Sequence, residues 1–187
     1  MKLINIFKHT KLVMKHKLVV FNLCCKIGIP WRGFMHDWSK FSPTEFWESI
    51  KYYRGNGSPI RLCKAEKGYS KAWLHHKGRN KHHPEYWIDY SLPDKTVIMP
   101  YKYAAEMICD KMAAGIVYSG KNWTPNTQID YYMKERETSL IHPQIDKFMI
   151  DIFTQVSKNG LDSTLTKQNI RNCYEKYCIR MENLNEN

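Results

Sequence analysis

The chain has 187 residues, of which 43% are hydrophobic and 25% are charged, and its net charge is +11. This composition excludes a disordered chain, and the length suffices for a substantial core, so we predict a single domain over residues 1–187. The basic charge favours an anionic partner such as a nucleotide, a nucleic acid or a phosphorylated metabolite. The alternative is a basic surface that only keeps the protein soluble.

The cysteines and the apolar segments indicate a protein of the reducing cytoplasm. None of the six cysteines forms a CxxC pair, and most stand in apolar helical surroundings, where a buried free thiol is typical. The apolar segment 18–29 is interrupted by a lysine and is too short to cross a bilayer. We therefore expect a cytoplasmic protein without a membrane partner.

The spacing of apolar residues predicts an all-α fold from the first element onward. Residues 12–27 carry an apolar stripe at three- and four-residue steps, with His16 inside it, and a short helix or turn follows over 31–37. The next helix is expected to begin with Ser42 as its N-cap, with Glu45 completing a capping box, and to end near position 55.

The rest of the chain is also expected to be helical. Pro100 opens a strong helix that places Glu106 and Asp110 on one face, beside small residues. The expected elements are a helix over 65–76, a loop over 79–100 with a helical turn near 85–90, a helix over 101–118, helices over 141–158 and 166–181, and a frayed tail over 182–187.

A histidine and an aspartate stand side by side at His36 and Asp37, in the string HDWSKF that also contains Lys40. Histidine is the commonest protein ligand of metals, and carboxylates fill the oxygen positions of hydrolytic metal sites. Such a pair at a helix end can give two ligands to one metal or one ligand to each of two, and a lysine one turn later can neutralise a phosphate. The alternative is a buried hydrogen bond between His36 and Asp37, with Lys40 in solvent.

Four histidines stand within nine residues in the string HHKGRNKHHPEYW at 75–87. Because only one of two neighbouring helical residues faces a given site, and Ala72 and Trp73 mark the buried side, His76 is favoured over His75 as a ligand. The sequence leaves open which of His82 and His83 binds. Glu85 is a candidate ligand, a candidate orienter of a histidine or a candidate general base. The alternative is a solvated basic loop that binds phosphates.

Asp110 is the candidate carboxylate ligand of the helix over 101–118, because two inward carboxylates are costly to bury without partners. Glu106, one turn earlier, is expected to act beside the metal rather than bind it. His16 lies within an apolar stripe and is therefore expected to point inward. In isolation it would be a satisfied core histidine, but among these neighbours we favour metal ligation.

Several common site motifs do not occur in the sequence. No phosphate-binding GxxxxGK[ST] loop, GxGxxG fingerprint, HExxH pair or zinc-finger spacing is found. Basic residues do alternate with aromatic ones at Lys51 to Arg54 and at Lys121 to Trp123, a composition that suits nucleic acid. The sequence shows no recognised nucleic-acid-binding fold motif, so nucleic acid remains an alternative partner.

The order H…HD…D resembles that of the HD superfamily of metal-dependent phosphohydrolases, which are all-helical. On that resemblance His16 takes the place of the first histidine, His36 and Asp37 form the HD pair, and Asp110 is the closing aspartate. The second-metal histidines of the superfamily would correspond to His76 and to one of His82 or His83. The HDxxK string is also similar to the HDxGK of HD-GYP phosphodiesterases, but the GYP element is missing, so cyclic dinucleotide hydrolysis is not implied.

The chain also resembles an uncharacterised bacterial and phage family, a domain of unknown function. Its members share the patterns HK..V, HD.SKF, HH...N.HHPEYW and EM..D, all of which occur here within residues 10–125. Helices at 141–181 follow this motif core more loosely. The resemblance brings no established activity.

Together these patterns predict an HD-like helical domain with one or two divalent transition metals. One metal would be bound by His16, His36, Asp37 and Asp110, and a second by His76 and His83, with Asp37 between them. Imidazole and carboxylate ligands suit Mn²⁺, Fe²⁺, Ni²⁺ or Zn²⁺ alike.

The predicted activity is metal-dependent hydrolysis of a nucleotide or another phosphate ester by metal-activated water. Lys40, Arg79 and Asn80 are the expected substrate contacts, and Lys40, Glu85 and Glu106 are the candidate catalytic residues. Three alternatives remain: a di-iron oxygenase of the HD type, a non-catalytic module that sequesters a nucleotide, and a nucleic-acid-binding protein with a structural metal.

Overall fold

The computed structural model describes residues 3–55 and 57–178 of the chain. In these residues the regular structure is helical apart from one isolated β-bridge between Ile88 and Thr96. This confirms the predicted all-α class. The expected end of the last helix at Met181 and the expected frayed tail lie outside the described residues. None of the described helices is both long and apolar enough to cross a membrane.

The first helix, α1 (Leu3–Lys26), begins nine residues before the start of the predicted apolar stripe and carries the longest buried face of the N-terminal half. Its buried residues recur at three- and four-residue steps, as expected for one face of a helix: His9, Val13, His16, Lys17, Val20, Leu23 and Cys24. Gly28 reverses the chain in a left-handed conformation with φ 78°, and α2 (Pro30–Met35) then packs back on α1. Three polar side chains of α1 therefore lie inside the protein.

The segment after α2 folds into η1 (Trp38–Phe41), α3 (Pro43–Tyr52), α4 (Pro59–Lys67) and α5 (Lys71–Lys77). The single helix predicted over 65–76 is therefore wrong, because the chain breaks between α4 and α5. Gly68 ends α4 in a left-handed conformation, and the Ser70 hydroxyl accepts the Trp73 N–H at 3.0 Å as the N-cap of α5. Both residues are ordinary stop and start signals.

The predicted capping box at the start of α3 is half right. The Ser42 hydroxyl accepts the Glu45 N–H at 3.4 Å, but the Glu45 carboxylate does not return to the Ser42 N–H, which donates instead to the Ser39 carbonyl. The Glu45 side chain is buried and bonded to His75 and His76. A residue that looked like a local cap is thus part of the protein interior.

The C-terminal half is built around α6 (Tyr101–Ser119), which lies between α1 and α10. The helix α7 (Thr127–Glu135) was not predicted, since it spans only nine residues and its apolar stripe is limited to Ile129, Tyr132 and Met133. The remaining elements are η2 (Pro84–Trp87), η3 (Gly120–Asn122), η4 (Arg136–Thr138), α8 (Pro143–Asn159), α9 (Leu161–Thr164) and α10 (Lys167–Cys178).

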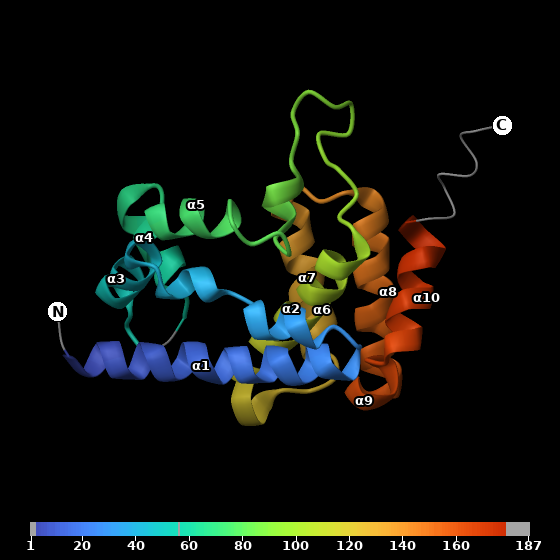
Figure 1. The fold of residues 1–187 in the computed structure, drawn as a ribbon, viewed down its shortest axis with the longest axis horizontal. Coiled ribbons are helices and arrows are strands. Elements are labelled where there is room, and N and C mark those ends of the chain that lie inside the picture. Colours follow the sequence, from blue (N-terminus) through green and yellow to red (C-terminus); the bar gives the residue numbers. More distant parts are fainter. Residues whose placement is uncertain (1–2, 56, 179–187) are drawn as a thin grey trace.

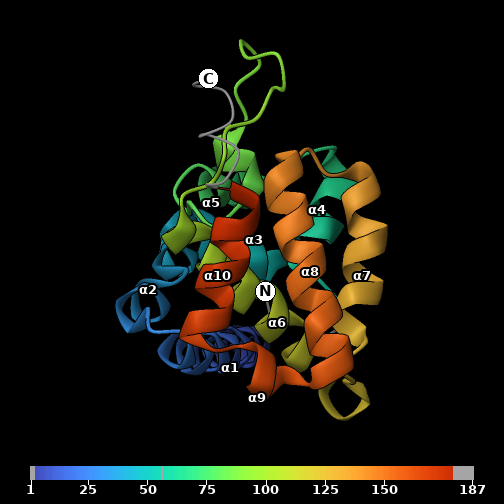
Figure 2. The ribbon, with the colours of Figure 1, turned by 90° about the vertical axis from the view of Figure 1, so that its right-hand side faces the viewer.

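The helices form two groups joined by α1, as Figure 1 shows. The short helices α3, α4 and α5 stand over the N-terminal half of α1, and α6, α7, α8 and α10 lie beside its C-terminal half, with α9 at their lower end (Figures 1 and 2). The main apolar core lies in the second group, where α6, α8 and α10 bury Met107, Ile108, Met112, Phe148, Ile152 and Ile170 among others. Between the two groups run α2, η1 and the loop after α5, which carry the HD pair and the histidine-rich string.

Candidate metal centre

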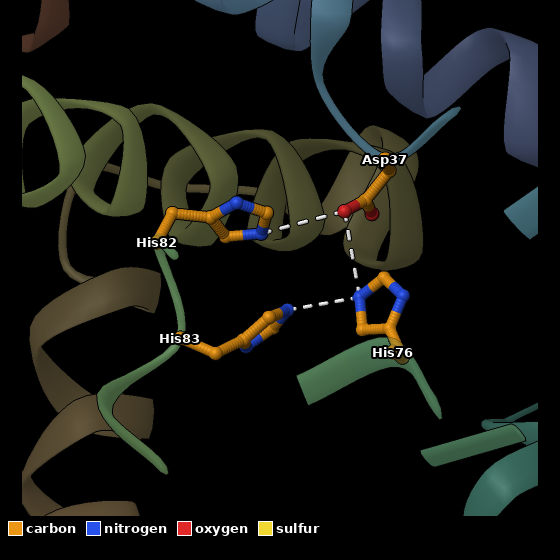
Figure 3. Close-up of side chains that lie close together, drawn as sticks. All are labelled: Asp37, His76, His82 and His83. Carbon is orange, nitrogen blue, oxygen red and sulfur yellow. Dashed lines mark hydrogen bonds and ion pairs between the residues drawn. The ribbon is translucent and has the colours of Figure 1, made fainter. Parts of the chain in front are cut away.

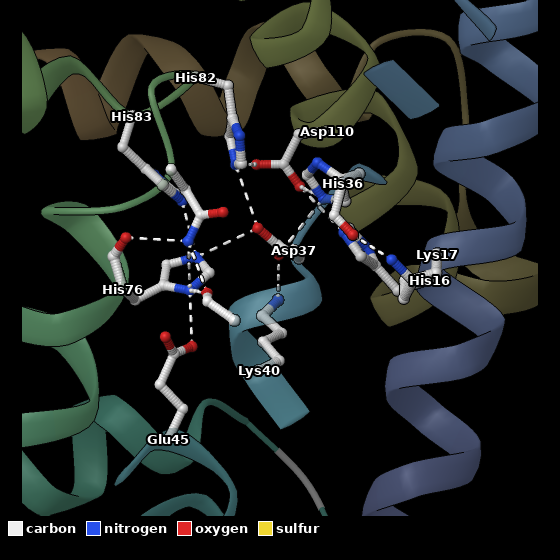
Figure 4. Close-up of polar contacts among 12 residues, drawn as sticks. His16, Lys17, His36, Asp37, Lys40, Glu45, His76, His82, His83 and Asp110 are labelled. Atoms are coloured by element: carbon white, nitrogen blue, oxygen red, sulfur yellow. Dashed lines mark hydrogen bonds and ion pairs between the residues drawn. The ribbon is translucent and has the colours of Figure 1, made fainter. Parts of the chain in front are cut away.

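The predicted ligands come together in one buried cluster from five parts of the chain. They lie on α1, at the end of α2, at the end of α5, in the loop that follows it and on α6 (Figure 4). The cluster members are His16, His36, Asp37, His76, His82, His83 and Asp110. His36, Asp37 and His82 each expose only 1% of their surface, so the cluster is closed to bulk water at its centre.

Asp37 is the central residue of this cluster. Its Oδ1 atom lies 3.4 Å from Nε2 of both His76 and His82, and its Oδ2 atom lies 3.3 Å from Nε2 of His36. The residue has φ 53°, a left-handed conformation that is uncommon outside glycine and best tolerated by Asn and Asp. This backbone geometry turns the carboxylate inward directly after α2 ends, so that it faces both sides of the cluster.

Two overlapping groups of ligand atoms meet at Asp37. One contains His16, His36 and Asp37, and the other contains Asp37, His76, His82 and His83; within each group the ligand atoms lie within 4.8 Å of one another. Figure 3 shows the second group, in which the His76 and His82 rings are directed at the carboxylate and His83 Nε2 lies 2.9 Å from His76 Nε2.

Asp110 closes the first group from α6. Its Oδ1 atom lies 2.9 Å from His16 Nε2 and 3.4 Å from His36 Nε2. Its other oxygen, Oδ2, lies 3.8 Å from His82 Nε2, and His36, His82 and Asp110 form a third set of candidate ligands. The two groups therefore form one continuous cluster, with the Asp37 carboxylate shared between them and the Asp110 carboxylate at its more exposed edge.

Two buried glutamates hold the far nitrogens of three of these rings. Glu106 Oε1 lies 3.1 Å from His36 Nδ1 and 3.3 Å from His82 Nδ1, and Glu45 Oε2 lies 2.7 Å from His76 Nδ1. An ionised carboxylate only accepts, so these rings carry the proton on Nδ1 and present the Nε2 lone pair to the interior. Carboxylate–histidine pairs of this kind fix the tautomer and the orientation of histidine ligands in metal sites.

Three polar atoms at the centre of the cluster are buried without a hydrogen-bond partner: His36 Nε2, His82 Nε2 and Asp37 Oδ1. Nearly all buried polar groups in proteins are hydrogen-bonded, and an orphaned one costs about 1–3 kcal/mol. The three atoms are two imidazole nitrogens and one carboxylate oxygen. Transition metals prefer such a set of ligand atoms. The residues therefore fit a divalent metal.

The charges of the cluster are strongly coupled. Burial acts to raise the pKa of Asp37 and of Asp110, but nearby His36, with Lys40 for Asp37 and His16 for Asp110, holds both pKa values well below the usual range. Burial and the charges of His82 and His76 hold the pKa of His83 well below its usual value. The carboxylates are thus ionised and His83 is neutral, which are the states that bind metal. Burial lowers the pKa of His36, but Asp37, Asp110 and Glu106 outweigh this and raise it well above its usual value, so a metal must displace a proton from this ring.

Lys40 stands at the edge of the cluster rather than in solvent. Its ammonium lies 2.7 Å from Asp37 Oδ2, and 30% of the side chain is exposed. Burial lowers its pKa, but Asp37 and Asp110 outweigh this and raise the pKa above its usual value. Lys40 is therefore a fixed positive charge that both a buried carboxylate and an outside ligand can reach.

The structure also separates the neighbouring residues of the histidine string. His76 faces the cluster, whereas His75 Nδ1 lies 2.7 Å from Glu45 and takes part in no ligand group. Asn80 Nδ2 donates to Ser39 Oγ at 2.7 Å and to the His76 carbonyl at 2.9 Å. Arg79 is exposed, and Glu85 is half-buried with one carboxylate oxygen lacking a partner. The proposed substrate contacts of Arg79 and Asn80, and the catalytic role of Glu85, stay predictions.

Four residues near the cluster were not expected from the sequence: His9, Lys17, Arg32 and Glu45. The Lys17 ammonium donates to the His36 carbonyl, and Arg32 Nε donates to Glu106 Oε2 at 2.7 Å. His9 lies two turns before His16 on the same face of α1, which is a periodicity that the sequence does contain. No local signal marks Glu45 or Arg32, whose partners are distant in the sequence.

Comparison with known proteins places the chain in one family. Residues 5–155 match the model of a family of unknown function, DUF5662, and the chain belongs to this family. The matched segment contains every residue of the cluster. No curated protein and no solved structure shows a significant match to the chain.

Proposed function

We propose that this DUF5662 member is a metal-dependent phosphohydrolase that acts on a nucleotide or another phosphate ester. The observation that carries the proposal is the group of buried ligand atoms around Asp37 without hydrogen-bond partners, each aimed at the same small space. The order His16, His36–Asp37, Asp110, which resembles that of HD phosphohydrolases, and the net charge of +11 support it. We infer one or two metal ions, with Asp37 shared where two are bound.

Mn²⁺, Fe²⁺, Ni²⁺ and Zn²⁺ all accept such imidazole and carboxylate ligands. When bound, a metal of this kind lowers the pKa of its water to near 7 and supplies hydroxide for attack on phosphorus. Glu45 and Glu106 keep the three imidazoles in the tautomer that binds, and Arg32 holds Glu106 in place. The protein thereby keeps its ligands oriented before a substrate arrives.

Lys40 is the residue that we expect to meet the phosphate. Its ammonium is fixed by Asp37 at 2.7 Å and partly exposed, so a phosphate oxygen at the edge of the cluster can reach it. A preorganised positive charge there stabilises the charge that develops on the phosphate oxygens during attack. Glu85, with its unpartnered buried oxygen, is the candidate proton acceptor, and exposed Arg79 is a candidate second cation for the substrate.

The test is a hydrolysis screen on chelator-treated protein to which each of the four metals is returned. The substrates are p-nitrophenyl phosphate, bis-p-nitrophenyl phosphate and a set of nucleotides, and phosphate or nitrophenol release is measured. We expect metal-dependent turnover of at least one ester. His142→Ala serves as a control that keeps its activity, because His142 accepts the Gln144 N–H at 3.2 Å as the N-cap of α8 and belongs to none of the ligand groups.

Other outcomes of the same screen would overturn the proposal. Tight nucleotide binding without turnover would identify a sequestering module. Oxygen consumption with an iron-loaded protein, without ester hydrolysis, would identify an oxygenase. Equal hydrolysis by the chelated and the metal-loaded protein would exclude metal-activated water as the nucleophile.

A further inference from the structure

A basic and aromatic groove lies beside the metal centre, between the N-terminal half of α1 and the end of α3. Its volume is about 800 Å³, which is large enough for a ligand of nucleotide size. Figure 1 shows the two elements that contribute most of its lining, the first turns of α1 and the helix α3 above them. The lining residues are Asn5, Lys8, Trp47, Ile50, Lys51, Tyr53, Arg54 and Gly55.

The groove carries three exposed cations and no carboxylate. Among residues 3–55 and 57–178, no ion pair joins Lys8, Lys51 or Arg54 to an acid. The two acids of α3 are turned away, because Glu45 bonds to His75 and His76, and Glu48 accepts from the Ser70 hydroxyl at 2.5 Å. The positive charge of the groove is therefore unbalanced, and it favours an anionic ligand.

Two aromatic side chains complete the lining. Half of the Trp47 surface is exposed, although a large apolar ring is normally covered, and Tyr53 is buried in the wall. Cations that follow a groove, together with exposed rings on which bases stack, are the features by which proteins bind single-stranded nucleic acid without sequence preference. The basic and aromatic residues Lys51, Tyr53 and Arg54, which lie close together in the sequence, thus line the same groove.

His9 lies on the buried face of α1 between the groove and His16 of the metal centre. The His9 ring packs on Tyr53 with ring centroids 5.4 Å apart, its Nδ1 is buried without a partner, and the charge of Lys40 reaches it. Along α1, the eleven residue steps from Asn5 to His16 span about 16 Å. A ligand that reaches from the groove to the metal centre is therefore longer than a single phosphate group.

We propose that this groove binds a base-and-phosphate ligand, a single strand of nucleic acid, with phosphates on Lys8, Lys51 and Arg54 and a base on Trp47. The strand would run along α1 past His9 toward Lys40. That the strand is the substrate of the metal centre rests on the proposed function, whereas the binding of the strand to the groove does not. The inference therefore names a class of substrate and a site that lies outside the ligand cluster.

The test measures binding of a fluorescein-labelled oligothymidylate of about ten nucleotides, a length within the usual site size, by fluorescence anisotropy. Chelator is present, so that hydrolysis cannot contribute. Two groove variants are each compared with a matched control. The double variant Lys51→Ala/Arg54→Ala is compared with Lys147→Ala/Lys158→Ala, which changes the net charge equally. The variant Trp47→Ala is compared with Trp31→Ala, which removes another exposed tryptophan.

We expect each groove variant to weaken binding about tenfold or more, since base stacking and phosphate contacts contribute that much, and each control to bind like the wild type. The double lysine–arginine variant should also lower the salt slope of log Kd by roughly 1.4, because each neutralised phosphate of a single strand contributes about 0.7. Equal binding by all four variants, or equal losses in the controls, would overturn the groove assignment.

Two further arms separate the possible outcomes. Thymidine monophosphate as a competitor shows whether the groove binds a strand or a single nucleotide. If it displaces the labelled oligothymidylate as well as an unlabelled strand does at the same concentration of nucleotide units, the proposal of a strand is wrong. Hydrolysis of bis-p-nitrophenyl phosphate, which is too small to need the groove, should be unchanged in the control variant Lys147→Ala/Lys158→Ala. If the wild type hydrolyses no ester with any metal, the proposed function fails while the anisotropy result still decides the groove.

Discussion

Two buried aspartates show how the candidate site differs from the scaffold. Asp146 exposes 8% of its surface, and both its oxygens accept hydrogen bonds, from the Tyr132 hydroxyl at 2.7 Å and from the Arg136 guanidinium. Asp37 exposes 1%, yet its Oδ1 has no hydrogen bond and faces two imidazole nitrogens at 3.4 Å. A carboxylate that serves the fold is saturated by donors, whereas one that serves a metal keeps a lone pair free.

The same contrast divides the sides of α6. One side carries Glu106 and Asp110, which contact three histidines of the cluster, and the other carries Met107, Ile108 and Met112 in the apolar core. The helix is therefore buried almost all round, but with two kinds of interior. Packing of the apolar side against α8 and α10 fixes the position of the polar side, so that the ligands are held by the core rather than by a loop.

The largest difference between the two aspartates is expected when the charge of each is removed in turn. Asp37→Asn keeps the left-handed backbone, which Asn also tolerates, but removes the shared ligand charge, so we expect turnover to fall by more than about 10²-fold. Asp146→Asn should retain turnover and lose about 1–3 kcal/mol of unfolding free energy, because it weakens charged hydrogen bonds to a half-exposed arginine. Steady-state hydrolysis and urea unfolding measure the two effects; equal losses of activity would contradict the distinction.

Two paired lysines provide a smaller test. Lys40 lies 2.7 Å from Asp37, and Lys111 lies 2.6 Å from Glu135 on the scaffold side. Lys40→Ala should lower turnover by about 10²-fold, the usual effect of losing one preorganised charge-stabilising group, and leave the metal content unchanged. Lys111→Ala should leave both unchanged. Full activity of Lys40→Ala on the best substrate would show that the phosphate binds elsewhere.

The sequence predicted the direct participants in the cluster better than the residues that hold them. The i, i+4 spacing placed Glu106 and Asp110 on one face, and the buried side of α5 favoured His76 over His75. His82 and His83 lie in a loop without periodicity, so the sequence could not separate them, and both belong to the second ligand group.

Three predictions failed because the deciding interactions are not visible in the local sequence: the role of Glu45, the single helix over 65–76 and the absence of α7. Glu45 had a sufficient local explanation as a cap, so its long-range bonds to His75 and His76 carried no signal. The break between α4 and α5 was marked by Gly68 and Ser70, but the apolar residues on both sides matched one helical period. The apolar stripe of α7 is too short to predict a helix by itself, and the packing of Tyr132 on Phe153 shows what holds the helix in place.

The smallest effects concern the glutamates behind the ligands. Glu45→Gln should weaken metal affinity about 10- to 100-fold, because the His76 ring loses the carboxylate that fixes its tautomer. Glu48→Gln, on the same helix, is the matched control, since Glu48 bonds to the start of α5 and to Cys63 of α4, away from the ligand cluster, and should affect stability alone. Competition titration with a metal-binding dye measures both variants. A loss of affinity in Glu48→Gln as large as in Glu45→Gln would place the effect in the fold of α3 and α5.

The most direct test of the central claim, that the Asp37 cluster holds metal, is elemental analysis of protein purified without chelator. We expect about one to two divalent transition-metal ions per chain, since a preformed set of deprotonated ligands binds metal tightly, and a clear loss in Asp37→Asn but not in Asp146→Asn. A wild-type content below about 0.2 ions per chain that Asp37→Asn does not change would contradict the account, because a site of this kind retains its metal during purification.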